Sequence, residues 1–197
     1  MRLIGLILST CYFLLSCSVP GKPDYTAKAV DTVTDTDGRA TVIITPTDGT
    51  SQMNNINTGN ITPQQVTGFA QTAIGIPYKY ASTDPKVGFD CSGFITYVFN
   101  HFGIAVPRTS VDFTHVKHDV PLQDSRPGDL ILFTGTDSHI RTVGHMGIVL
   151  SNPGDTVKFI HATSGRKYGV TISPLTAGYT KRFVKVIRIF PQNDQKP

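Results

Sequence analysis

One cysteine of the chain is placed where its side chain could act as a nucleophile. Cys91 follows Asp90 and precedes Ser92-Gly93-Phe94, a pattern typical of a helix start with Asp90 as the N-cap. The helix dipole at such a position favours the thiolate form of a cysteine. A buried structural thiol is the alternative interpretation. The helix-start position favours the catalytic one.

A thiol nucleophile needs a base, and two of the six histidines lie inside apolar segments. His145 and His161 occur in runs that have the pattern of strands, whereas the other four lie in polar connections or at a helix end. The two runs are joined around Asn152-Pro153-Gly154-Asp155, as in an antiparallel hairpin. A five-residue loop would place the histidines directly opposite each other on one face, and a four-residue loop would shift the register by one. The chemistry favours the first, with one imidazole as base and the second as its orienter.

Helical and strand patterns divide the chain into two parts. Thr62-Pro63-Gln64-Gln65 has the form of a capping box and predicts a helix that ends at Gly75, and a second helix should run from Asp90 or Cys91 to Gly103. Short strand-like runs follow, at Leu130 to Phe133, Val143 to Leu150, Val157 to Ala162 and Arg182 to Phe190. Helices followed by strands predict an α+β domain in which N-terminal helices pack on an antiparallel sheet.

The first residues have the pattern of a bacterial export signal. An apolar run from Leu3 to Leu15 behind Arg2 is too short to span a bilayer, and it ends in Leu14-Leu15-Ser16-Cys17, which resembles a lipobox. We therefore expect a signal peptide over residues 1–16 and lipidation at Cys17. The bulky Leu15 departs from the usual lipobox, and an ordinary signal with an incidental cysteine is the alternative. Because Cys11 also lies in this segment, Cys91 is the lone thiol of the expected mature body.

Composition separates a linker from a folded domain and excludes some function classes. Residues 17–60 are rich in Thr, Asp, Asn, Gly and Pro and predict a flexible linker, within which Ala40 to Ile44 could form one short strand. We expect the catalytic domain over 61–193 and a short tail over 194–197. The formal charge of +4 is mild for 197 residues, and Lys and Arg are scattered, so nucleic-acid binding has no support.

Five short motifs resemble, in order and spacing, those of the NlpC/P60 cysteine peptidases. The resemblance covers about residues 61 to 190 and rests on Asp90-Cys91-Ser92-Gly93-Phe94, Pro107-Arg108-Thr109-Ser110, Pro127-Gly128-Asp129-Leu130, Gly144-His145-Met146-Gly147-Ile148 and His161-Ala162. It implies a papain-like core and peptidoglycan stem peptides as substrate. It also implies that Cys91 is the nucleophile, His145 the base and His161 the third polar residue.

The same resemblance implies further residues around the thiol. Tyr78 corresponds to a tyrosine whose hydroxyl points into the site, and Tyr78, Asp90 and Ser92 are the expected substrate and oxyanion residues, beside the backbone N–H of Cys91. An ordinary half-buried aromatic is the alternative for Tyr78. Tyr80-Ala81-Ser82 departs from the aromatic-Gly-Gly of many members, so the substrate loop could differ.

The leading interpretation is a lipid-anchored, monomeric endopeptidase of the bacterial cell wall that uses no cofactor. The outer membrane is favoured over the inner one as the site of the anchor. Alternatives are a papain-like amidase or acyltransferase on another substrate and a non-catalytic wall-binding lipoprotein. A zinc site formed by Cys91, His145 and His161 has little support, because no closely spaced ligand pair occurs.

Overall fold

A computed structural model describes residues 31–34, 40–43, 55–152 and 156–195 of the chain. The chain divides into two compact units, residues 1–47 and 48–197. In the first unit, strands β1 (Asp31–Thr34) and β2 (Ala40–Ile43) pair antiparallel. The short strand expected near Ala40 is therefore present, with a partner that the linker composition did not predict. The expected signal peptide and Cys17 lie outside the described residues.

Two helices open the larger unit where their capping signals predict. Helix α2 (Pro63–Thr72) begins at the capping box, in which Thr62 Oγ1 accepts from the Gln65 N–H at 3.3 Å and the Gln65 side chain accepts from the Thr62 N–H at 2.9 Å. Helix α3 (Cys91–His101) begins after Asp90. The two helices contact each other through the stacked rings of Phe69 and His101, whose centroids lie 3.7 Å apart. The body also includes the buried Ile56, so it extends to the N-terminal side of residue 61.

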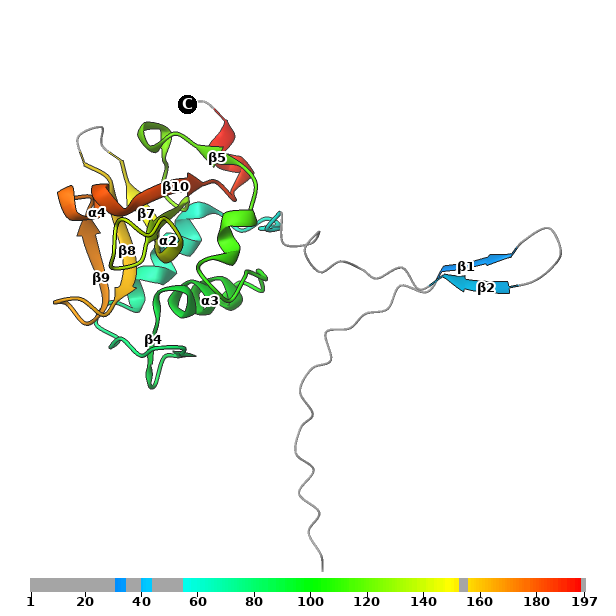
Figure 1. The fold of residues 1–197 in the computed structure, drawn as a ribbon, viewed down its shortest axis with the longest axis horizontal. Helices are drawn as coiled ribbons and strands as arrows, with labels where there is room; N and C mark the ends of the chain where they lie inside the picture. Colours follow the sequence, from blue (N-terminus) through cyan, green and yellow to red (C-terminus); the bar gives the residue numbers. More distant parts are fainter. Residues whose placement is uncertain (1–30, 35–39, 44–54, 153–155, 196–197) are drawn as a thin grey trace, which may run out of the picture. The chain divides into compact units, whose positions relative to one another are not determined.

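A six-stranded antiparallel sheet forms the rest of the body (Figure 1). Its strands, in spatial order, are β5 (Asp119–Val120), β10 (Phe183–Ile187), β6 (Leu130–Thr134), β7 (Val143–Ser151), β8 (Lys158–Thr163) and β9 (Gly169–Pro174). A separate two-stranded ribbon of β3 (Thr83–Asp84) and β4 (Gly88–Phe89) precedes α3. The expected α+β class with helices first and an antiparallel sheet afterwards is confirmed.

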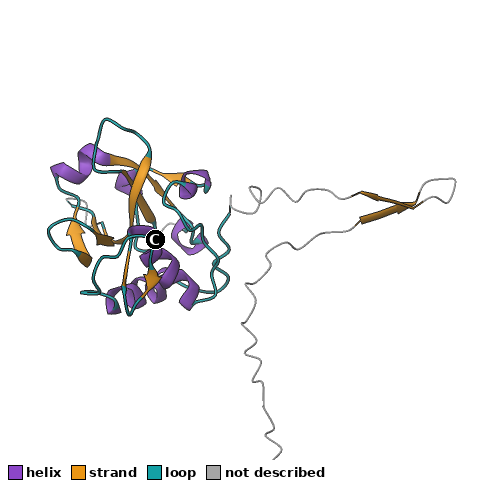
Figure 2. Ribbon diagram, turned by 60° about the horizontal axis from the view of Figure 1, so that its bottom comes forward, coloured by secondary structure: helices purple, strands orange, loops and turns teal. Residues whose placement is uncertain are grey.

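The central strands carry apolar side chains on both faces of the sheet, and both faces are buried. Alternate residues such as Leu132, Met146 and Ile160 join the core shared with α2 and α3. The intervening residues, among them Phe133 and Phe159, form a second cluster with Tyr179 of helix α4 (Ala177–Arg182). Helical segments consequently flank the strands on both sides, as Figure 2 shows.

Strand β9 and helix α4 were not predicted, and both matter for the site. The strand β10 expected to start at Arg182 starts at Phe183, because α4 includes Arg182. Three short 3-10 helices complete the body at Asp112–His115, Leu122–Asp124 and Pro191–Asp194. Among the described residues, none of the helices has both the length and the apolar character needed to cross a bilayer.

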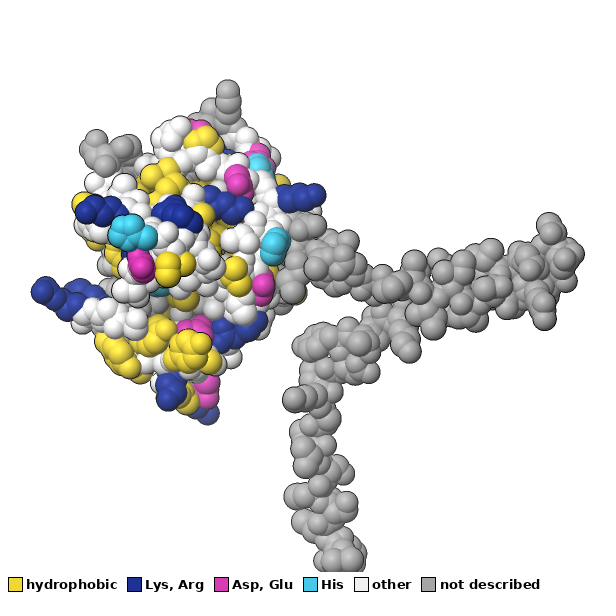
Figure 3. Space-filling model, in the orientation of Figure 1, with side chains coloured by type: hydrophobic (Ala, Val, Ile, Leu, Met, Phe, Trp, Pro, Cys, Tyr) yellow, Lys and Arg dark blue, Asp and Glu magenta, His cyan; other side chains and the backbone are white. Residues whose placement is uncertain are grey.

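Charged side chains are dispersed over the visible surface of the larger unit. On the face that Figure 3 shows, Lys and Arg alternate with acidic and hydrophobic side chains and form no continuous stripe. This distribution agrees with the scattered basic residues of the sequence.

Candidate active site

Cys91 occupies the first position of α3, and a charged network holds the start of that helix. The Asp90 carboxylate caps the helix by accepting from the Gly93 N–H, and Arg108 binds the same carboxylate through two N–H groups at 3.1 and 2.9 Å. Arg108 also donates to the Ser92 hydroxyl at 3.0 Å. Asp90 and Ser92 are buried, and the Ser92 hydroxyl donates to the Asp90 carboxylate at 3.3 Å. These two residues therefore hold the helix start beside the thiol.

The Cys91 sulfur lies against the backbone at the beginning of β7. The thiol makes a long contact of 3.9 Å to the carbonyl oxygen of Gly144. Burial, followed by the negative charge of Asp90, raises the pKa of the thiol, while the N–H groups of Ser92, Met146 and Cys91 itself oppose that rise. The raised pKa favours the protonated thiol at neutral pH, in contrast to the thiolate that the helix start alone would favour, because burial and Asp90 outweigh the N–H groups.

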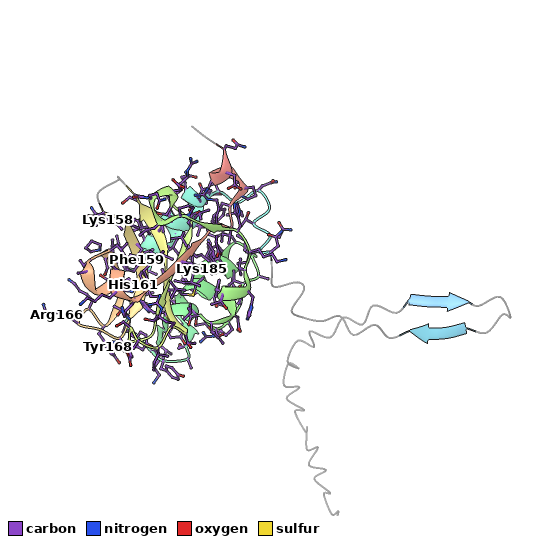
Figure 4. All side chains as sticks on the ribbon, turned by 45° about the horizontal axis from the view of Figure 1, so that its top comes forward. Lys158, Phe159, His161, Arg166, Tyr168 and Lys185 are labelled. Atoms are coloured by element: carbon purple, nitrogen blue, oxygen red, sulfur yellow. The ribbon has the colours of Figure 1, made fainter. Side chains whose placement is uncertain are left out.

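The two strand histidines form a directly bonded pair. Nε2 of His145 lies 2.8 Å from Nδ1 of His161, and the ring planes are 79° apart. Both are buried, and Figure 4 shows His161 inside the body next to Phe159 of the same strand, whereas Arg166 and Tyr168 lie at the periphery. The expectation that both imidazoles lie on one face of the β7–β8 hairpin is met.

The expected register, in contrast, is wrong. Ile148 pairs with Ile160 and Val149 with Phe159, which places Gly147 and not His145 opposite His161. The pair nearest the turn, Ser151 with Lys158, has another register, and the shift between Val149 and Ser151 leaves the histidines offset by two residues on the same face. The sequence pattern around the turn does not reveal this shift. The histidines are diagonal neighbours, a relation that still brings long side chains into contact.

Gly147 makes the diagonal contact possible. A Cβ atom at this position would lie 2.7 Å from the Ile160 carbonyl oxygen and 3.1 Å from the Cβ of His161. Because glycine has no side chain, the space next to Gly147 is open to the His161 side chain, whose ring contacts His145.

Burial, with positive charge nearby as the smaller cause, favours the neutral form of both rings. Burial, then His161 and then Arg182, lower the pKa of His145 well below its usual value. Burial and Arg182 lower the pKa of His161 to about 4. Nε2 of His161 lies 3.0 Å from the Ser173 hydroxyl and 3.5 Å from that of Tyr179. Ser173 comes from β9 and Tyr179 from α4, the two elements that were not predicted.

Cys91 and His145 meet at one cavity of about 530 Å³. Its lining includes Cys91, His145, Tyr78 and Tyr179. Among the described residues, no hydrogen bond joins the sulfur to the His145 ring. The thiol instead contacts the carbonyl oxygen of Gly144, the residue before His145. Because Nε2 of His145 is bonded to His161, Nδ1 is the ring nitrogen available for proton transfer.

A second cavity of about 500 Å³ also borders the thiol. Cys91 and Tyr78 line both cavities. The second cavity is also lined by the bonded Asp90, Ser92 and Arg108 and by Tyr80 and Ala81. Ala81 has a positive φ of 58°, a conformation that costs less for glycine than for alanine.

Tyr78 is half-buried at the boundary of the two cavities. Its backbone N–H donates to the Tyr168 carbonyl at 3.3 Å, and a β-bridge pairs it with Phe89. Gly88 permits this approach, since a Cβ there would lie 2.5 Å from the Pro77 carbonyl oxygen. Burial first, and then Cys91 and Asp90, raise the pKa of Tyr78, so its hydroxyl stays protonated as a possible donor.

The predicted site residues of the catalytic domain therefore lie together, and four further ones join them. Arg108 lies in the Pro107-Arg108-Thr109-Ser110 motif, which by itself predicts no role for it, and Ser173, Tyr179 and Arg182 carry no sequence signal beyond their polar character. Across the described residues, no three His, Cys, Asp or Glu side chains are grouped as ligands of a metal ion would be.

Comparisons with known proteins agree with this fold. The sequence model of the NlpC/P60 family matches residues 75–188, more than half of the chain, and the chain belongs to this family. The gamma-DL-glutamyl hydrolase of Bacillus subtilis is 36% identical over 122 residues, which cover 61% of this chain and 28% of that protein. An Escherichia coli protein named murein DD-endopeptidase and murein LD-carboxypeptidase is 32% identical over 109 residues, covering 55% and 52%.

Solved structures show the same domain. A crystal structure of an NlpC/P60 family protein from Bacillus cereus has a TM-score of 0.59 and 25% identity, covering 79% of this chain and 46% of that one. The P60 domain of an antigen from Mycobacterium avium subspecies paratuberculosis has a TM-score of 0.52 and 26% identity, covering 64% and 93%. The chain spans about half or less of the length of the curated relatives cited above.

Proposed function

We propose that this protein is a cysteine endopeptidase that cleaves amide bonds in peptidoglycan stem or cross-link peptides. The observation that supports it most is the Cys91 thiol at a helix start, in one cavity with His145, whose ring is bonded to that of His161. Family membership and relatives named endopeptidases support the peptidase class. The proposed roles are nucleophile for Cys91, base for His145 and orienter for His161.

The reaction follows from the proton positions in the resting site. The thiol proton passes to Nδ1 of His145 while the sulfur attacks the carbonyl carbon of the scissile amide. The N–H groups of Cys91 and Ser92 at the helix start, with the Tyr78 hydroxyl beside them, stabilise the negative oxygen of the tetrahedral intermediate. His145 then donates its proton to the leaving amine, and an acyl-enzyme remains on the sulfur. Water, deprotonated by His145, releases the acid and restores the thiol.

Mass spectrometry of peptidoglycan fragments tests this proposal. The full-length protein, purified in detergent, is incubated with isolated peptidoglycan and with defined stem peptides. We expect new fragments that differ from the substrates by one hydrolysed amide bond, and none with Cys91→Ala. If peptidoglycan and stem peptides stay intact while a γ-linked glutamyl peptide is cleaved, the alternative of an amidase on another substrate replaces the proposal. Binding to peptidoglycan without any cleavage would favour a wall-binding lipoprotein.

We also propose that the protein is anchored to a bacterial membrane, with the outer membrane favoured, through lipid on Cys17. The support is the Leu14-Leu15-Ser16-Cys17 ending behind an apolar run. Cys17→Ala should move the protein out of the detergent-extracted membrane fraction, and the N-terminal peptide of the wild type should carry acyl mass. Unchanged partitioning together with an unmodified N-terminal peptide would contradict this anchor.

A further inference from the structure

An arginine without a carboxylate partner lines the cavity that contains the catalytic groups. Arg182, at the C-terminal end of α4, borders the same space as Cys91 and His145. One of its N–H groups donates to the Gly135 carbonyl oxygen at 3.1 Å, and its guanidinium carbon lies 5.0 Å from the centre of the Tyr179 ring. The remaining donors of the guanidinium have no acceptor among the described residues.

The arginine of the second cavity, in contrast, is neutralised by an acid, because Arg108 binds Asp90 at 2.9 Å. Arg141, whose donors bond the backbone carbonyls of Lys181 and Phe183, is not among the residues that line the cavity of Arg182. Around Arg182 the structure describes no carboxylate within ion-pair distance, and no Asp or Glu is among the residues that line its cavity. A half-buried positive charge thus faces a space that a substrate must enter.

The position of His145 determines which part of the substrate enters this space. The base must return its proton to the leaving amine, so the residue that carries that amine lies on the His145 side of the sulfur. Only the cavity with Arg182 includes His145 among its lining residues, whereas the cavity with Arg108 does not. The residue released as the amine product therefore occupies the Arg182 cavity.

We propose that Arg182 binds a carboxylate carried by the residue whose amine is released, and that this contact selects peptides with an acidic leaving residue. The guanidinium offers paired N–H donors that match a carboxylate, and its contact with Tyr179 fixes its direction. This inference rests on the proposed peptidase function, because it uses the assignment of His145 as the base.

A structural role is the competing explanation. Arg182 connects α4 with the segment after β6 through Gly135, and its charge contributes to the lowered pKa of both histidines. Its removal could therefore reduce turnover of every substrate equally. A preference for a charged over an uncharged leaving residue separates the two explanations, since loss of structure does not depend on the substrate.

The first experiment compares two peptides that differ only by a carboxylate or a carboxamide on the leaving residue. The full-length wild type should show a kcat/KM at least about tenfold higher for the carboxylate peptide. In Arg182→Gln the ratio of the two values should fall to near one, whatever the absolute rates, and Arg182→Lys should retain part of it. The control Lys181→Gln removes the neighbouring exposed charge, which does not line the cavity, and should keep the wild-type ratio. An unchanged ratio in Arg182→Gln would overturn the proposal.

A binding measurement separates failure of this inference from failure of the proposed function. Calorimetry with the uncleaving Cys91→Ala protein should show tighter binding of the carboxylate peptide, and Arg182→Gln in the same background should abolish the difference. Preferential binding without hydrolysis by the wild type would support the Arg182 site and contradict the peptidase. Hydrolysis by the wild type, with equal binding and equal kcat/KM for both peptides, would support the peptidase and contradict the site.

Discussion

Nε2 of His145 lies 2.8 Å from Nδ1 of His161, and this contact sets the proton positions of the whole site. If Nδ1 of His145 is to accept the thiol proton, its ring proton must be on Nε2 and must be donated to His161. His161 then carries its own proton on Nε2 and donates it to Ser173 at 3.0 Å. In this arrangement a hydroxyl on β9 accepts the last hydrogen bond of a chain that begins at a base two strands away.

Replacing that hydroxyl tests the proton arrangement. Ser173→Ala should lower kcat about fivefold with little change in KM, because a net hydrogen bond is worth about 1 kcal/mol and Tyr179 replaces it only from 3.5 Å. Ser173→Thr should restore most of the loss, and Ser173→Ala combined with Tyr179→Phe should lose more than Ser173→Ala alone. Steady-state kinetics on one peptide is sufficient. A changed KM at constant kcat would show that Ser173 contacts substrate instead.

Stability should fall as the solution is acidified below pH 6.5. The pKa of His161 is about 4 in the folded protein and about 6.5 in the unfolded chain, so between these values only the unfolded chain binds the proton. His161 alone accounts for a loss of roughly 3 kcal/mol of unfolding free energy from pH 7 to pH 4, and His145 acts in the same direction.

Urea unfolding at several pH values measures this loss. His161→Gln should show a clearly smaller decrease between pH 6.5 and 4, whereas replacement of the exposed His139 by Gln should follow the wild type. Parallel curves for His161→Gln and the wild type would mean that His161 is already charged in the folded protein or is not buried as described.

The thiol should react as an ordinary protonated cysteine before substrate binds. Because burial and Asp90 raise its pKa, alkylation of Cys91 by iodoacetamide should increase with pH to a midpoint above about 8.5. Asp90→Asn should move the midpoint down, since it removes the negative charge. Mass spectrometry of the Cys91 peptide distinguishes this thiol from Cys11 and Cys17. A midpoint below pH 7 would instead indicate a preformed thiolate and imidazolium pair.

Gly147 provides a steric test of the histidine pair. Gly147→Ala should destabilise the domain by about 1–3 kcal/mol and reduce kcat, because the added methyl group lies within 3.1 Å of the Ile160 carbonyl oxygen and of His161. Gly178→Ala is the matched control, since a Cβ on that α4 residue meets nothing within 4 Å. Thermal unfolding and kinetics of the two variants check the expectation, and equal behaviour would contradict it.

The parts of the site that follow local rules could be predicted from the sequence. The capping residues Thr62 and Asp90 mark both helix starts, and the period of two along the strands places His145 and His161 on one face. The offset between the histidines depends on the pairing of Ser151 with Lys158 next to the turn and on the register shift that follows it, and local patterning encodes neither. Ser173 and Arg182 could not be found because β9 ends at a proline and α4 is a short helix that contacts the site only through tertiary packing.

The central claim is that the Cys91 sulfur attacks the peptide as a nucleophile, with His145 as the base and His161 as its orienter. The most direct measurement is the initial rate of peptide hydrolysis by full-length wild type, Cys91→Ala and His161→Ala on one defined stem peptide. We expect no turnover above background with Cys91→Ala, and residual turnover with His161→Ala, reduced by at most about four orders of magnitude. Iodoacetamide should abolish the wild-type rate. Hydrolysis by Cys91→Ala at the wild-type rate would contradict the account.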